Sequence, residues 1–176
     1  MLLRRKAIEK VGLFDEDFFI FFEETDLCFR LWLAGYFVMY EPKSVIYHLG
    51  GGDTTSSDSY LYERRMHLSL RNMLCSYIKN FGAGNMLTIL PIFILIELGL
   101  ALYWLVTFKM NLTIAILRAF LWNITSMRKT MEKRRIIQHK IRKISDFALN
   151  NQIIRNPSFS YYLYLFAGKL SSFKDK

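Results

Sequence analysis

A run of 23 residues near the middle of the sequence, MLTILPIFILIELGLALYWLVTF at 86–108, constrains the fold more than any other feature. It contains one charged residue, Glu97, and one proline, Pro91. A helix needs about 20 apolar residues to cross the hydrocarbon layer, so the run predicts a transmembrane helix. It lies too far along the chain to be a signal peptide. The alternative is a buried helix of a soluble domain. Glu97 is expected either to pair with Arg118 or to remain uncharged between helices.

Charge is distributed unevenly on the two sides of this run. The chain has a net charge of +9, but residues 1–85 hold 10 basic and 11 acidic side chains, whereas residues 109–176 hold 14 basic and 3 acidic ones. Basic residues on both flanks favour a cytoplasmic position for each flank, which a hairpin returning through 110–126 would allow. Two cysteines, Cys28 and Cys75, are too few for a disulfide framework and fit a reducing, cytoplasmic environment.

The first part of the chain alternates between helical and extended patterns. MLLRRKAIEKVG predicts a short amphipathic helix that Gly12 stops, and a second helix is expected from about Thr25 to Gly35. YFVMYEP at 36–42 and SVIYHLG at 44–50 have the composition of two short strands separated by a turn at Pro42. The GGGDTTSSDS that follows is a flexible loop by composition.

The second part of the chain is helical by pattern. A polar, aromatic helix is expected from about 59 to 80, and the apolar stretch 110–126, short and split by Arg118, is typical of an interfacial helix. MRKTMEKRRIIQHKIRKIS predicts a basic amphipathic helix, followed by a tail rich in tyrosine. The expected organisation is therefore a catalytic-domain fragment, an interfacial linker helix, transmembrane or interfacial helices and a basic amphipathic tail, at 1–58, 59–85, 86–126 and 127–176.

Three acids, Glu23, Glu24 and Asp26, directly follow the apolar run FFIFF. Carboxylates in an apolar setting repel one another and resist ionisation, so this arrangement costs stability unless a cation, a donor or a reaction uses it. The simplest alternative is an N-terminal helix cap, because the helix dipole favours negative charge there. Arg30 lies four residues after Asp26, on the same helix face, and can pair with it.

GLFDEDFFIFFEETDLCFRLWLAGY, followed by EPKSVIYHLGG, resembles the C-terminal part of the catalytic domain of family 2 glycosyltransferases. The likeness is greatest to rhamnosyltransferase-like enzymes that extend membrane-linked polysaccharides of the cell envelope. These enzymes show Gly-x-Phe-Asp-Glu-x-Phe-Phe, then Glu-Asp/Glu-x-Asp-Leu-x-x-Arg, then a glycine, then a strand ending in His-x-Gly. The resemblance covers roughly residues 1–80. It implies an α/β fold, an acceptor-side fragment of a GT-A (Rossmann-like) domain, followed by a membrane-associated helical region.

The resemblance also implies roles for the acids. Glu24, at the position where the family more commonly has Asp, would be the general base that deprotonates the acceptor hydroxyl in an inverting transfer. Burial and a neighbouring charge such as Glu23 would raise its pKa toward that task. Glu23, Asp26 and Arg30 would bind or orient the acceptor or support the loop.

A donor-side role is implied for residues further on. His48 would complete the coordination of a divalent metal ion, Mg²⁺ or Mn²⁺, that holds the nucleotide-sugar donor; the alternative is a core histidine. Gly50, Gly51 and Gly52 begin a loop that would close over the donor, although a plain surface loop has the same composition. The family's nucleotide-binding half, with its Asp-x-Asp metal motif, comes before these motifs. We therefore expect a truncated frame, half of a split enzyme or a fragment of a longer product.

The leading hypothesis is a membrane-associated glycosyltransferase fragment at the cytoplasmic face of the cell membrane. It would move a sugar from a nucleotide-sugar to a lipid-linked or polysaccharide acceptor, with inversion, and would need a partner chain or segment for donor binding. Its expected partners are membrane lipid and a lipid-linked glycan. The alternative is a non-enzymatic, membrane-anchored module whose basic helix binds anionic lipid or a protein. Nucleic-acid binding through 128–143 draws on charge alone, and we expect none.

Overall fold

A computed structural model describes residues 1–45, 47 and 59–153 of the chain. His48, Gly50, Gly51 and Gly52, to which the resemblance gives metal and donor-loop roles, lie outside the described residues. The chain divides into two compact units, Met1–Asp146 and Phe147–Lys176. The first unit contains three of the four segments expected from the sequence and part of the fourth.

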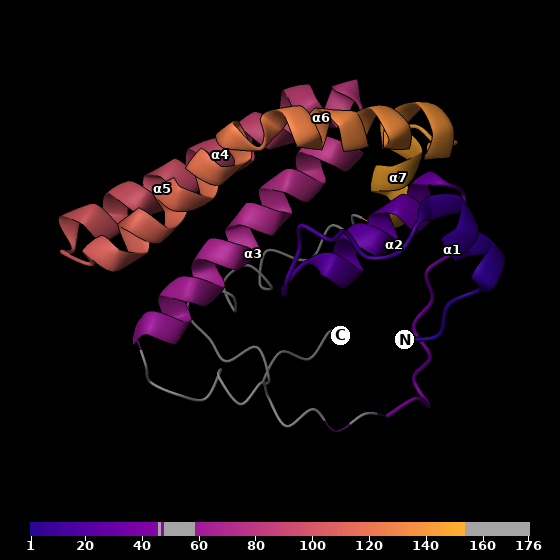
Figure 1. Ribbon diagram of the computed structural model, residues 1–176, viewed down its shortest axis with the longest axis horizontal. Helices are drawn as coiled ribbons and strands as arrows, with labels where there is room; N and C mark the ends of the chain where they lie inside the picture. The colour runs from indigo at the N-terminus through magenta and orange to yellow at the C-terminus, as the bar shows by residue number, and fades with distance from the viewer. Residues whose placement is uncertain (46, 48–58, 154–176) are drawn as a thin grey trace. The chain divides into compact units, whose positions relative to one another are not determined.

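The regular structure of the described residues is helical (Figure 1). Gly12 and Gly35 follow the first two helices with φ of 81° and 83°, a conformation that glycine adopts without strain, so both predicted stop signals are confirmed. The elements are α1 (Arg5–Val11), α2 (Glu23–Leu33), α3 (Ser59–Asn80), α4 (Ala83–Val106), α5 (Met110–Thr125), α6 (Met127–Ile136), a π-helical turn η1 (Ile137–Ile141) and α7 (Asp146–Ile153).

The expected α/β fold is wrong, because the described part of the chain contains helices and no strand. Residues 36–45, which cover the first expected strand and the start of the second, have no regular structure apart from a turn at Pro42. There the Ser44 amide donates to the Glu41 carbonyl at 3.0 Å. Strand composition is not sufficient for a strand, because its backbone groups need a neighbouring strand as partner. The described residues supply none, and Phe37 and Met39 are exposed.

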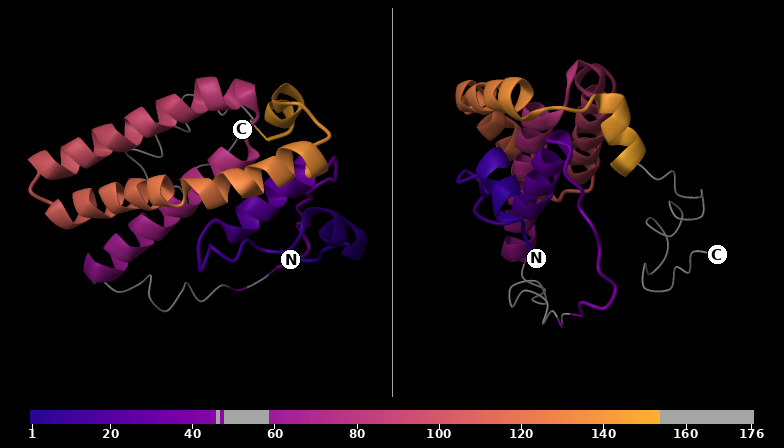
Figure 2. Two further views of the ribbon diagram at one scale, coloured as in Figure 1. Left: turned by 45° about the horizontal axis from the view of Figure 1, so that its top comes forward. Right: turned by 90° about the vertical axis from the view of Figure 1, so that its right-hand side faces the viewer.

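α3 is the central helix of the first unit and contacts α2, α4, α5 and α6 (Figure 2). Its apolar residues face two neighbouring helices. Leu70 packs in a cluster with Ala101, Ile116 and Ala119. Leu74 and Ile78 pack with Leu90 of α4. The helix expected to lead toward the membrane is thus also the element on which the others assemble.

α4 and α5 form a helical hairpin joined by a short turn, and the Thr113 hydroxyl donates to the Ala101 carbonyl at 3.2 Å between them. Most of α4 is exposed: Leu87, Leu95 and Val106 are 78%, 68% and 67% exposed. A core helix of a soluble domain would be buried, so this exposure argues against that alternative. Among the described helices, α4 alone is long and apolar enough to cross a membrane.

The predicted basic helix is confirmed as α6 with η1, and part of its charge is used inside the unit. Ile137 and Ile141 are buried. Arg134 donates to the carbonyls of Ile78 and Phe81, and Arg142 donates to the carbonyl of Asn80. These carbonyls lie at the end of α3, where a helix leaves backbone acceptors without intrahelical partners. The two arginines therefore cap α3.

Candidate functional site

A strained turn precedes α2 and fixes where the acids lie. Phe21 and Phe22 have φ of 68° and 71°, in the left-handed region that costs a non-glycine residue about 1–3 kcal/mol. The Asn72 side chain of α3 holds this turn by donating to the carbonyls of Ile20 at 2.9 Å and Phe21 at 2.7 Å. α2 consequently begins at Glu23, two residues earlier than the sequence pattern indicated.

The three acids of the first turn of α2 have three different environments. Glu24 is exposed. Glu23 is half-buried, and its Oε2 is buried with no hydrogen-bond partner among the described residues. Asp26 is fully buried. Glu24 is therefore the most exposed of the three carboxylates, and the expectation that it is buried is wrong.

Asp26 is the centre of a buried hydrogen-bond network between α2 and α3. Its Oδ1 accepts hydrogen bonds from Ser76 Oγ and Asn80 Nδ2, each at 2.8 Å, and lies 3.0 Å from Lys79 Nζ. Its Oδ2 accepts from Arg30 Nε at 3.0 Å, which confirms the predicted pairing. A buried charge is tolerated when it is paired and hydrogen-bonded in this way. Asp26 and Arg30 thus hold the scaffold of the site together.

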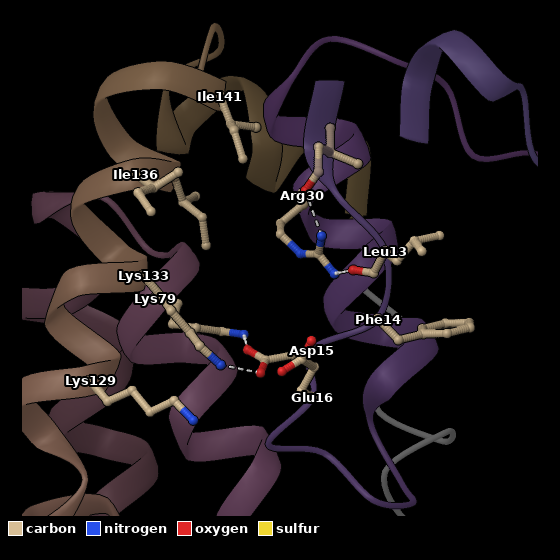
Figure 3. Close-up of a pocket in the computed structure, with 12 residues that line it drawn as sticks. Leu13, Phe14, Asp15, Glu16, Arg30, Lys79, Lys129, Lys133, Ile136 and Ile141 are labelled. Carbon is tan, nitrogen blue, oxygen red and sulfur yellow. Dashed lines mark hydrogen bonds and ion pairs between the residues drawn. The ribbon is translucent and has the colours of Figure 1, made fainter. Parts of the chain in front are cut away.

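Arg30 uses its remaining N–H groups to fix the loop between α1 and α2 (Figure 3). Nη1 donates to the carbonyls of Val11 at 2.6 Å and Gly12 at 3.2 Å, and Nη2 donates to that of Leu13 at 2.7 Å. The planar guanidinium suits several fixed acceptors at once. One arginine therefore ties the α1–α2 loop to α2 and, through Asp26, to α3.

Asp15 and Asp17, in the DED of this loop, pair with lysines of α3 and α6. Asp15 accepts from Lys79 and Lys133 (Figure 3). Asp17 accepts from Lys129 and, at 2.7 Å, from Lys133. Burial raises the pKa of Asp15, but the attraction of Lys79 and its hydrogen bonds with Lys133 and Lys79 outweigh it and hold that pKa well below its usual range. The pKa of Asp17 is lowered for similar reasons.

A cavity of about 260 Å³ lies beside Asp15, between the α1–α2 loop and the α6–η1 segment (Figure 3). Apolar side chains of both segments line it together with Asp15, Glu16, Arg30 and three lysines; Glu24 does not. Within the described residues no group of His, Cys, Asp or Glu forms a candidate metal site. Asp15, Asp17 and Asp26 are already bound to cations. These three aspartates are therefore not available as ligands of a divalent metal ion.

Sequence reasoning missed the part of α3 that supports the site. Asn72, Ser76 and Asn80 recur at intervals of four and so lie on one face of the helix, the face that contacts the α2 region. Arg71 adds a hydrogen bond to the Asp17 carbonyl at 2.9 Å. Polar residues at helical spacing on a face that is otherwise buried are the signal that could have identified this support.

Part of the chain is similar to a known enzyme. Over 48 residues it is 42% identical to N-acetylglucosaminyl-diphospho-decaprenol L-rhamnosyltransferase of Mycobacterium tuberculosis, in strains CDC 1551 / Oshkosh and ATCC 25618 / H37Rv. The match covers 27% of this chain and 16% of the length of each relative. No family model and no solved structure matches the chain. About a quarter of the chain is therefore similar to part of a glycosyltransferase.

Proposed function

We propose that this chain is the acceptor-side, membrane-associated part of an inverting glycosyltransferase. It takes part in moving a sugar from a nucleotide-sugar donor to a lipid-linked or polysaccharide acceptor at the cytoplasmic face of the cell membrane. The observation that carries the proposal is the strained turn at Phe21 and Phe22, which Asn72 holds and which ends two residues before the exposed Glu24. Backbone strain that a rigid scaffold maintains is typical of functional sites. The similarity to a rhamnosyltransferase supports the same reaction class.

Glu24 acts as the general base in this proposal. A sugar hydroxyl is a poor nucleophile, so the Glu24 carboxylate accepts its proton as the oxygen attacks the anomeric carbon of the donor. The bond from that carbon to the nucleotide diphosphate breaks on the opposite face, which inverts the configuration. The exposure of Glu24 gives the acceptor access, and the Asp26 network keeps the first turn of α2 in place.

The donor site belongs, in this proposal, to residues other than those described. His48 and the loop at Gly50, Gly51 and Gly52 remain predicted donor-side residues. A nucleotide-binding half, supplied by another segment or by a partner chain, binds the donor next to Glu24. We assign no step of the reaction to a divalent ion, because His48, the residue predicted to coordinate it, lies outside the described residues.

The test is the Glu24→Gln variant of the chain, assayed together with a donor-binding half. Transfer of nucleotide-activated L-rhamnose to an N-acetylglucosaminyl-diphospho-polyprenol in membranes is the first reaction to measure. We expect Glu24→Gln to lower the rate about 10²–10⁴-fold, because no general base is then available to take the proton from the attacking hydroxyl. Glu132→Gln, at an exposed glutamate of α6, is the matched control and should keep the rate. Equal rates for the two variants would refute Glu24 as the base.

The non-enzymatic alternative, in which the basic helix binds anionic lipid or a protein, has less support. Lys129 and Lys133 pair with the acids of the α1–α2 loop, and Arg134 and Arg142 cap α3. These charges stabilise the unit itself. They are consequently less available to an outside partner than the sequence alone indicated.

A further inference from the structure

The exposed face of α4 is apolar along its whole length. Its large exposed side chains are hydrophobic from Leu87 to Val106, and the helix carries a single charged residue, Glu97, which is only partly exposed. Beside it, α5 exposes a second apolar stripe at helical spacing: Ile114, Leu117, Leu121 and Ile124. Contiguous apolar surface of this kind marks a contact with protein or lipid.

The register of the α4–α5 hairpin places the charged residue Arg118 beside the middle of α4. Ala101 and Thr113 lie opposite each other, so in an antiparallel pair Arg118 lies at the level of Ile96, near the centre of the Ala83–Val106 helix. One sequence-based alternative paired Arg118 with Glu97. Instead, Arg118 lies 3.7 Å from Glu63 of α3, and its side chain is 66% exposed. α3 runs along α5 here, with His67 Nδ1 3.3 Å from the Ala115 carbonyl.

These charges conflict with a helix that crosses the bilayer. If α4 stood along the membrane normal, the ion pair between Arg118 and Glu63 would lie near the middle of the hydrocarbon layer. A charged side chain at that depth is unfavourable even on the most lenient insertion scale. If α4 lies parallel to the surface, its outer face enters the acyl chains and the ion pair stays near the water.

We propose that α4 lies in the plane of the bilayer, with its outer face in the acyl chains of one leaflet and both of its ends on the same side. The residues at the α4–α5 turn fit this placement. Lys109 Nζ lies 4.6 Å from the Trp104 ring centroid, and the Tyr103 ring packs edge-on against Trp104. Trp, Tyr and Lys are the residue types that occupy the membrane–water interface. This inference rests on the membrane association in the proposed function and adds its geometry.

The test is the side from which each end of α4 can be labelled. In the full chain, with Cys28→Ser and Cys75→Ala as background, single cysteines are introduced by Ala83→Cys, Thr107→Cys and Arg128→Cys. The last is a reference on α6, where the Arg128 side chain is 95% exposed. Sealed inverted and right-side-out membrane vesicles are treated with a maleimide that does not cross membranes. We expect all three variants to react in the same vesicle orientation. Labelling of Ala83→Cys and Thr107→Cys from opposite sides would overturn the inference and leave membrane association intact.

A second measurement identifies what covers α4. A fluorophore attached through Leu95→Cys should be quenched by lipids with brominated acyl chains, whereas one attached through Arg128→Cys should not. Absence of quenching in a chain that sediments with vesicles would overturn the inference, because protein rather than lipid would then cover α4. Failure of the parent chain to associate with vesicles would contradict the membrane part of the proposed function as well. Circular dichroism of each variant checks that the helices have formed.

Discussion

Asp26 and Glu24 lie two positions apart on α2, yet their side chains have opposite surroundings. Asp26 is fully buried and is bound by Arg30, Ser76, Lys79 and Asn80. Glu24 is exposed. A carboxylate already bound by that many donors cannot take a proton from a substrate without breaking the network. The acid that the protein holds most firmly is therefore a structural residue, and the proposed base is its exposed neighbour.

The lowered pKa of Asp15 predicts that the protein is less stable at acid pH. Its pKa in the folded chain lies below the ordinary value of 3.8, so its contribution to stability is complete above that value and is lost as the pH falls toward the lower, folded-state pKa. The free energy of unfolding should therefore decrease as the pH falls below about 5. Asp15→Asn should make this decrease shallower. Urea unfolding in mild detergent, followed by tryptophan fluorescence from about pH 6 to pH 2, measures it.

Lys133→Met is the matched variant, because it removes a partner of the same carboxylate. It should also make the acid-induced decrease shallower. If both variants retain the slope of the parent chain, the ion pairs of Asp15 do not set its acid stability.

Single-residue features could be predicted only where they are local. The pair between Asp26 and Arg30 follows from their spacing of four on one helix, and the structure contains it. The pairs of Asp15 and Asp17 with α6 span 118 and 112 residues. No residue close in sequence to Asp15 or Asp17 indicates these lysine partners, because the pairing depends on how α6 packs against the α1–α2 loop. From the sequence alone, the basic stretch is therefore equally compatible with a surface that binds anionic lipid or a protein.

At the scale of elements, the backbone strain of the turn before α2 predicts how substitutions at Phe21 change stability. Glycine adopts positive φ freely, whereas an L-residue there costs about 1–2 kcal/mol. Phe21→Gly should therefore be more stable than Phe21→Ala by about 1 kcal/mol. Phe37 is exposed and does not have a positive φ. Phe37→Ala should therefore be more stable than Phe37→Gly, because glycine adds conformational freedom to the unfolded chain. Thermal or urea unfolding of the four variants measures both differences; alanine more stable than glycine at both positions would argue against a strained turn.

The helices followed from the sequence and the strands did not, for one physical reason. A helix satisfies its backbone within itself, so periodicity and a glycine at Gly12 or Gly35 were sufficient to predict it. A strand is completed by a neighbour that its own residues do not specify. The segment 36–45 has strand composition, but the described residues offer no strand to pair with it.

At the scale of the whole molecule, the structure predicts that membrane binding resists salt. Burial of the apolar face of α4 is not screened by ions, whereas attraction between a basic helix and anionic lipid is. The chain should remain with anionic vesicles when KCl is raised from about 0.1 M to 1 M, conditions between which the Debye length falls from about 10 Å to 3 Å. Co-sedimentation measures this.

A double variant, Arg135→Gln with Lys140→Gln, removes two exposed cations of the α6–η1 segment and should bind like the parent chain. Release by salt, or weak binding of this variant, would favour the basic helix as the anchor.

The ion pairs between the α1–α2 loop and α6 also set an order for biosynthesis. Lys129 and Lys133 leave the ribosome more than a hundred residues after Asp17 and Asp15, and after both α4 and α5. The nascent loop therefore lacks its α6 partners while the apolar hairpin emerges, and only Lys79 of α3 is already available to Asp15. The contacts between the α1–α2 loop and α6 therefore form after the apolar hairpin has emerged, so a ribosome that stalls before Lys129 leaves Asp17 without its α6 counterions.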